Sequence, residues 1–170
     1  MTSIPWLLPG VVAAFTMAVL LSTRVAALLR TNRRSAILLM TAAGLVAAAT
    51  LTPTRLRLDY GYPGSGVCDL SRFGPPRIDE WLLLGDPALN VLLFVPLGAA
   101  IAFLPRTRRT AAVVVAAAAS PFVIEFVQLA VKALGRGCQS GDVVDNLLGL
   151  VIGLLGGTVV TAALRRRPGA

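Results

Sequence analysis

Polar side chains that could support chemistry stand inside two strongly apolar runs of this chain. Glu125 and Gln128 interrupt the first run, and Asp142, Asp145 and Asn146 open the second. A carboxylate within a segment of membrane-spanning length is costly, and such residues usually mark ligand sites, ion pathways or proton relays. Two carboxylates in different surroundings can also act as a general acid and a general base. These five residues are the first candidates for a functional site.

Their spacing places the candidates on particular helix faces. Glu125 and Gln128 are three residues apart and therefore lie on one helical stripe. A simpler interpretation is that Glu125 is a buried hydrogen-bonding strut between helices. Asp142 has an equally simple interpretation as a helix N-cap, because Asp is favoured at that position.

The second apolar run continues the polar stripe with glycines. Gly149 and Gly153 follow Asn146 on the same helix face. Small residues at four-residue intervals let a neighbouring helix approach closely, so we expect these two glycines to have a packing role.

A second Asp–Asn pair precedes these runs. Asp86 and Asn90 have the same four-residue spacing as the later aspartate and asparagine. We expect this pair to face Glu125 and Gln128 across an outward-opening polar cleft. Arg136 would lie at the rim, where it could pair with one of the acids or with an anionic head group.

Composition indicates that a lipid bilayer surrounds these residues. Hydrophobic residues make up 56% of the 170-residue chain, and the mean hydropathy is +0.78. The formal net charge is +8, but the arginines stand in short clusters between apolar runs, which is typical of membrane loops rather than of a nucleic-acid-binding surface. There is no His and there are two Cys, which excludes a His/Cys metal site and a Ser-His-Asp triad.

The hydropathy pattern predicts an all-α fold, with five transmembrane helices in a single domain covering residues 1–170. No basic stretch precedes the first apolar run, so we expect a retained helix rather than a cleaved signal peptide. A long loop rich in Gly and Pro should separate the second and third helices. The predicted spans are residues 4–29, 35–52, 87–104, 111–134 and 143–164.

The distribution of Lys and Arg predicts the orientation. The segments after the first, third and fifth spans carry ten arginines and no acids, whereas the segments on the opposite side carry six basic and six acidic residues. Because the positively charged side is normally cytoplasmic, we expect the N-terminus outside and the C-terminus inside.

Two cysteines fall on the predicted outer side. Cys68 lies in the long loop and Cys138 in the connection before the last span. We expect a disulfide between them, which chain-entropy arguments value at about 4 kcal/mol. Two unrelated free thiols are the alternative.

The order and spacing of these motifs resemble the VanZ-like family. The resemblance covers residues 86–157 and is carried by Asp86/Asn90/Phe94-x-Pro96-x-Gly98, by Glu125-x-x-Gln128 and by Arg136…Asp142-x-x-Asp145-Asn146-x-x-Gly149-x-x-x-Gly153. It implies a multi-pass protein of the bacterial inner membrane, in a family named for a protein of teicoplanin resistance. The long outer loop and its cysteine pair depart from the family pattern. Pro96 removes a backbone hydrogen bond and predicts a kink in its helix.

Three functions remain open at this stage. The first is binding of a lipid-linked cell-wall precursor or other envelope molecule in the polar cleft, with an effect on envelope-directed antibiotics. The second is an intramembrane enzyme with Glu125 and Asp145 as acid and base, and the third is a small proton-coupled transporter. We favour a role without catalysis and expect no cofactor, although Glu125, Asp142 and Asp145 have the oxygen ligands that a divalent cation would use. We expect membrane lipids as partners and no nucleic acid.

Overall fold

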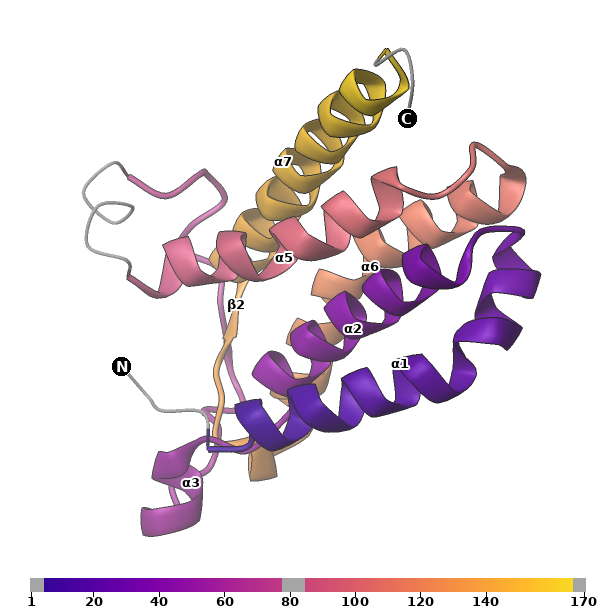
Figure 1. Ribbon diagram of the computed structural model, residues 1–170. Helices are drawn as coiled ribbons and strands as arrows, with labels where there is room; N and C mark the ends of the chain where they lie inside the picture. The colour runs from indigo at the N-terminus through magenta and orange to yellow at the C-terminus, as the bar shows by residue number, and fades with distance from the viewer. Residues whose placement is uncertain (1–4, 78–84, 167–170) are drawn as a thin grey trace.

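The computed structural model describes residues 5–77 and 85–166, and most of these residues are helical. Within these residues five helices form the bundle, a short helix and a 3-10 turn lie in its connections, and two very short strands pair with each other (Figure 1). In chain order the elements are α1 (Leu7–Leu29), α2 (Arg33–Thr50), α3 (Arg55–Tyr60), β1 (Cys68–Asp69), α5 (Asp86–Ala102), α6 (Arg108–Ala130), η1 (Lys132–Leu134), β2 (Cys138–Gln139) and α7 (Ser140–Arg165).

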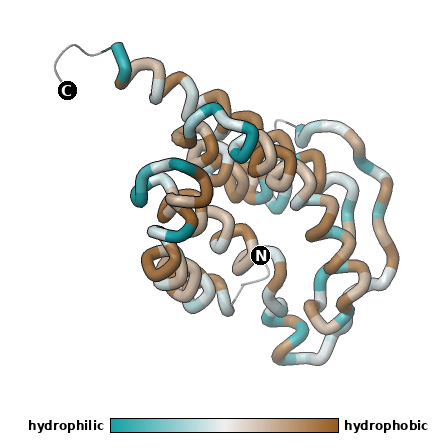
Figure 2. The backbone as a smooth tube through the Cα atoms, turned by 90° about the vertical axis from the view of Figure 1, so that its right-hand side faces the viewer, coloured by the Kyte–Doolittle hydropathy of each residue, from teal (hydrophilic) through white to brown (hydrophobic). Residues whose placement is uncertain are grey.

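Four of these helices are long and apolar enough to cross a membrane. They are α1, α2 with its continuation to Tyr60, α6 and α7, and α5 is a shorter apolar helix. In Figure 2 the helices are coloured mostly for hydrophobic residues, while hydrophilic residues gather at helix ends and in the connections. Large apolar side chains such as Leu8, Phe126 and Val159 are exposed on the outside of the bundle, as expected for helices that face lipid.

The helix boundaries differ from the predicted spans by a few residues. The α6 helix begins at Arg108 because the Thr107 hydroxyl accepts a hydrogen bond from the Thr110 backbone N–H at 3.2 Å. It ends at Ala130, and the 3-10 turn η1 occupies residues that we had assigned to the span. The α7 helix begins at Ser140, so Asp142 lies in its first turn rather than at its N-cap.

The predicted loop between the second and third spans contains some regular structure. Thr54 caps α3, and β1 pairs in parallel with β2 so that Cys68 stands opposite Cys138. The backbone N–H of Thr54 also donates to the Leu134 carbonyl at 3.0 Å. Residues 78–84 of this loop lie outside the described part of the chain.

The α5 and α7 helices pack with their backbones in close contact. A Cβ added at Gly149 or Gly153 would overlap the carbonyl oxygen of Val91 or Val95, and one added at Gly98 would overlap the Leu150 carbonyl. Only glycine allows this approach. Pro96 lies on the exposed side of α5, away from these contacts.

The α6 helix contains a second proline that compensates locally for its missing donor. Pro121 cannot donate to the carbonyl of Ala117, and the neighbouring Ser120 hydroxyl donates to that oxygen instead, at 2.8 Å. The α6 helix therefore continues through Pro121 and carries Glu125 and Gln128 beyond it.

The connections gather at two ends of the bundle. We call the group formed by residues 51–77 and 131–142 the loop end, and the group formed by residues 30–32 and 103–109 the arginine end. The loop end lies at the left and bottom of Figure 1, and the two short turns of the arginine end lie together at its right. The guanidinium of Arg109 donates to the Leu28 carbonyl and links these two turns.

Candidate functional site

A bidentate ion pair joins the long loop to α7. Arg72 donates to both carboxylate oxygens of Asp145, with Nη1 3.0 Å from Oδ1 and Nη2 2.5 Å from Oδ2. The Asp145 side chain is fully buried, and the Arg72 side chain is 30% exposed. Arg72 also donates to the Gly74 carbonyl, and its own carbonyl accepts a 2.7 Å hydrogen bond from the Ser140 hydroxyl. The loop is therefore fixed to the start of α7 through one residue, Arg72.

The remaining polar residues of α7 face the start of α5. The Asn90 side chain and Asp86 both lie close enough to the Asp142 carboxylate to interact with it. Asn146 is 1% exposed, and its side-chain oxygen accepts no hydrogen bond from the described residues. The predicted Asp86/Asn90 pair and the α7 residues thus lie together at the loop end.

Glu125 connects α6 to the start of α7. Its Oε2 accepts a 2.7 Å hydrogen bond from the backbone N–H of Gln139, and the residue is only 5% exposed. Gln139 is the N-cap residue of α7 and has no side-chain capping bond of its own. A negative group at a helix N-terminus is favourable, because the unpaired N–H groups there carry partial positive charge.

Gln128 and Arg136 have a different role, at the end of α2. The Gln128 amide donates to the Thr50 carbonyl at 3.0 Å, and Arg136 donates to the carbonyls of Thr52 at 3.1 Å and Ala49 at 2.5 Å. The last carbonyls of a helix have no partner within it, so these side chains cap α2. Burial lowers the pKa of the Arg136 guanidinium from its usual value, but arginine stays charged at any physiological pH.

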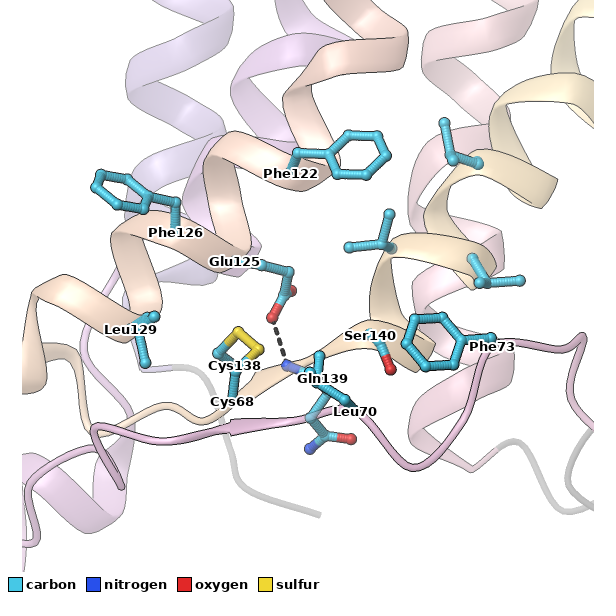
Figure 3. Close-up of a pocket in the computed structure, with 13 residues that line it drawn as sticks. Cys68, Leu70, Phe73, Phe122, Glu125, Phe126, Leu129, Cys138, Gln139 and Ser140 are labelled. Atoms are coloured by element: carbon cyan, nitrogen blue, oxygen red, sulfur yellow. Dashed lines mark hydrogen bonds between the residues drawn. A yellow bond between two sulfur atoms is a disulfide. The ribbon is translucent and has the colours of Figure 1, made fainter.

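A pocket of about 530 Å³ opens between α6 and α7, above the paired strands (Figure 3). Its walls are apolar side chains of both helices and of the long loop, and Glu125 is the one charged residue among the described residues that line it. The Cys68–Cys138 disulfide and Gln139 form its floor. The lining residues are Cys68, Leu70, Phe73, Phe122, Glu125, Phe126, Leu129, Cys138, Gln139, Ser140, Val143, Val144 and Leu147.

The predicted polar residues direct their hydrogen bonds to different partners, although Glu125, Arg136 and Asp142 lie close enough to one another to interact electrostatically. Only Glu125 among the eight predicted polar residues lines the pocket. Gln128 and Arg136 donate to carbonyls at the end of α2, Asp145 pairs with Arg72, and Asp142 lies near Asn90. Glu125 and Asp145 therefore do not meet in one cavity, and among the described residues no group of three or more His, Cys, Asp and Glu side chains is placed to hold a metal ion.

Sequence reasoning missed Arg72 and the aromatic lining of the pocket. The signal for Arg72 was available, because a buried Asp145 requires a cation and the long loop supplies four arginines. The sequence predicts Arg136 as a partner for one of the acids or for an anionic head group, whereas its hydrogen bonds in the structure go to carbonyls at the end of α2. Phe122 and Phe126 flank Glu125 on α6 and resembled ordinary lipid-facing residues.

The paired strands hold the pocket floor in place. Cys68 and Cys138 are directly opposite each other in the strand register, with a Cα–Cα distance of 4.5 Å, and they form a disulfide across 70 positions of the sequence. In β1 the Ser71 backbone N–H donates to the exposed Asp69 carboxylate at 2.9 Å and keeps its pKa below the usual value. Together with the Arg72 contacts, the disulfide fixes the loop segment that bears Leu70 and Phe73.

Comparison with known proteins assigns a family. The family model described as VanZ/LLP1 matches residues 7–161, which is nearly the whole described chain. No curated protein and no solved structure matches the chain.

Proposed function

The chain belongs to the VanZ/LLP1 family, and we propose that it binds an amphipathic molecule of the bacterial envelope in the α6–α7 pocket. Its apolar helices and its family make it a multi-pass membrane protein. By holding such a molecule, it would lower the susceptibility of the cell to teicoplanin-type glycopeptides. This second step rests on the resemblance to the family's namesake.

The pocket itself carries the proposal. A cavity of about 530 Å³ falls in the range of small-molecule sites, which are usually apolar with a few placed polar groups. Phe122 and Phe126 at its edge are 57% and 67% exposed, on the side of α6 that would face lipid. A hydrocarbon chain could therefore enter from the bilayer, and its polar end would reach Glu125 at the pocket floor.

The arginine distribution supports an outward-facing pocket. The pocket lies at the loop end, whereas the arginine end bears Arg30, Arg106 and Arg109 and no acids. Because cytoplasmic loops are enriched in Lys and Arg, we infer that the arginine end is cytoplasmic. The N-terminus and the pocket would then lie on the outer side of the cytoplasmic membrane, where envelope precursors and glycopeptides occur.

Filling the pocket tests this function. Val144 lines the pocket and is partly buried, so the substitution Val144→Trp places an indole inside it. Val159 lies on the same helix, is 69% exposed and does not line the pocket, which makes Val159→Trp the matched control. We expect wild-type protein and Val159→Trp to raise the teicoplanin concentration that inhibits a susceptible host, and Val144→Trp to give the value of the empty vector.

Membrane levels of each variant, measured by immunoblot, must be equal for this comparison. Protection by Val144→Trp at the wild-type level would refute a role for the pocket. Lack of protection by the wild-type protein would refute the link to glycopeptides. In that case, binding of an amphiphile to the pocket is measured directly on purified protein.

A further inference from the structure

We propose that the α6–α7 pocket selects amphiphiles whose polar end carries an ammonium group, over amphiphiles that end in a phosphate. This inference rests on the proposed binding function and names the chemistry of the ligand. Two observations carry it. Glu125 has hydrogen-bonding capacity that is not filled, and none of the described residues that line the pocket is cationic.

Glu125 has more acceptor capacity than the described residues use. A carboxylate offers about four lone-pair sites, and here one hydrogen bond, from the Gln139 backbone N–H to Oε2, is present. Within residues 5–77 and 85–166 no side chain donates to Oε1. The Glu125 side chain is nevertheless only 5% exposed and lies in a wall of apolar side chains. A buried carboxylate with unused acceptor sites is costly, so a ligand that donates hydrogen bonds to Glu125 would gain most of its selectivity here.

The cations near this end of the bundle donate their hydrogen bonds to other groups, although Arg136 lies close enough to Glu125 to interact with it electrostatically. Arg72 binds the Asp145 carboxylate, and Arg136 donates to two carbonyls at the end of α2. Neither lines the pocket. A phosphate, which is an acceptor of hydrogen bonds and carries negative charge, would meet a carboxylate and no counter-charge from the described lining residues.

An ammonium group fits the same surroundings. It is compact, it donates three hydrogen bonds and it accepts none. One donor can reach Oε1 of Glu125, and the phenyl rings of Phe122 and Phe126, which lie above the carboxylate in Figure 3, add to the apolar lining. The apolar walls, formed by side chains such as Leu129 and Val143, would enclose the hydrocarbon chain.

The experiment compares two single-chain probes that differ in their head group. Purified protein in phosphatidylcholine nanodiscs is photolabelled with a diazirine-bearing dodecylamine, and unlabelled dodecylamine or dodecyl phosphate competes for the label. Mass spectrometry of peptides locates the label. We expect labelling of the segments around Phe122 and Val143, and dodecylamine should compete at a roughly tenfold lower concentration than dodecyl phosphate, as for one well-placed charged hydrogen bond.

The variant Glu125→Gln should abolish most of this preference, because an uncharged amide of the same size replaces the carboxylate. Gln can still accept the bond from the Gln139 backbone, so the fold is retained, and the melting temperature of the variant checks this. Val115→Ala is the matched control, since Val115 lies on α6, is 68% exposed and does not line the pocket. It should keep the wild-type preference.

Each outcome separates the two levels of the proposal. Equal competition by amine and phosphate, or a preference that persists in Glu125→Gln, overturns the ammonium inference and leaves pocket binding intact. Labelling spread over lipid-facing peptides, with no competition by either probe, overturns both the inference and the binding function.

Discussion

At the loop end, buried polar side chains join segments that are far apart in the sequence, whereas at the arginine end exposed guanidiniums lie on two short turns. The Arg72–Asp145 ion pair, the Glu125–Gln139 bond and the disulfide connect the long loop, α6 and α7. At the arginine end, the exposed Arg109 guanidinium donates to the Leu28 carbonyl, and the Thr107 hydroxyl caps the first turn of α6. The two ends therefore depend on their polar residues to different degrees.

The difference follows from the surroundings of each group. A buried polar group must be paired within the protein, because water does not replace a lost partner. An exposed arginine keeps its hydration, so its contacts contribute little to the stability of the fold. Its charge mainly determines which way the protein is oriented across the membrane. We expect the loop end to be the more rigid part and the part where single substitutions cost most.

The largest effect should come from Arg72→Ala. This substitution leaves the fully buried Asp145 carboxylate without its cation, and removing one partner of a buried pair typically costs about 3–5 kcal/mol. We expect a loss of this order in the free energy of unfolding, measured by SDS titration in mixed micelles. Arg106→Ala at the arginine end should change it by less than about 0.5 kcal/mol, because Arg106 is exposed.

The double variant Arg72→Ala/Asp145→Ala sharpens this test. It removes both charges, so it should regain part of the stability lost in Arg72→Ala. If Arg72→Ala and Arg106→Ala had equal effects, the proposed contrast between the two ends would be wrong.

A smaller loss should follow removal of the disulfide. Cys68→Ser combined with Cys138→Ser frees a loop that spans 70 positions, and losing such a constraint typically costs about 2–4 kcal/mol. We expect dithiothreitol to lower the melting temperature of the wild-type protein and to leave that of the double variant unchanged. An equal response of both proteins to the reductant would show that the disulfide does not stabilise the fold.

The sequence predicted the elements of this fold better than their polar contacts. Apolar run length predicted five transmembrane helices; all five helices form within a few residues of the predicted bounds, and four of them are long enough to cross a membrane, whereas α5 is shorter. The four-residue spacing of Gly149 and Gly153 predicted a close helix contact, and Val91 and Val95 of α5 occupy it. The helix positions and the glycine contact depend on local sequence pattern, so they can be predicted without a structure.

The partners of the candidate site residues depend on tertiary structure. Nothing local distinguishes Arg72 from Arg136 as the partner of Asp145, since either cation would satisfy a buried carboxylate. The direction of the Gln128 side chain, toward the last carbonyl of α2, requires knowing that α2 ends beside α6. Helix-face periodicity predicts that Gln128 and Glu125 lie on one stripe of α6. In the structure Gln128 donates to the end of α2, whereas Glu125 accepts a hydrogen bond from the start of α7.

The last prediction compares two arginines that cap helices at opposite ends. Arg136 is partly buried and donates to the Ala49 carbonyl of α2 and to the Thr52 carbonyl just beyond it, whereas Arg109 is exposed and donates to the Leu28 carbonyl of α1. Hydrogen bonds from charged groups contribute about 1.5–3 kcal/mol where water is excluded, so Arg136→Ala should lower the free energy of unfolding by about 2 kcal/mol. Arg109→Ala should lower it by less than about 0.5 kcal/mol, because water can take the place of the guanidinium at an exposed carbonyl. The same SDS titration measures both values. Equal losses would mean that burial does not determine how much a capping arginine contributes to stability at the two ends.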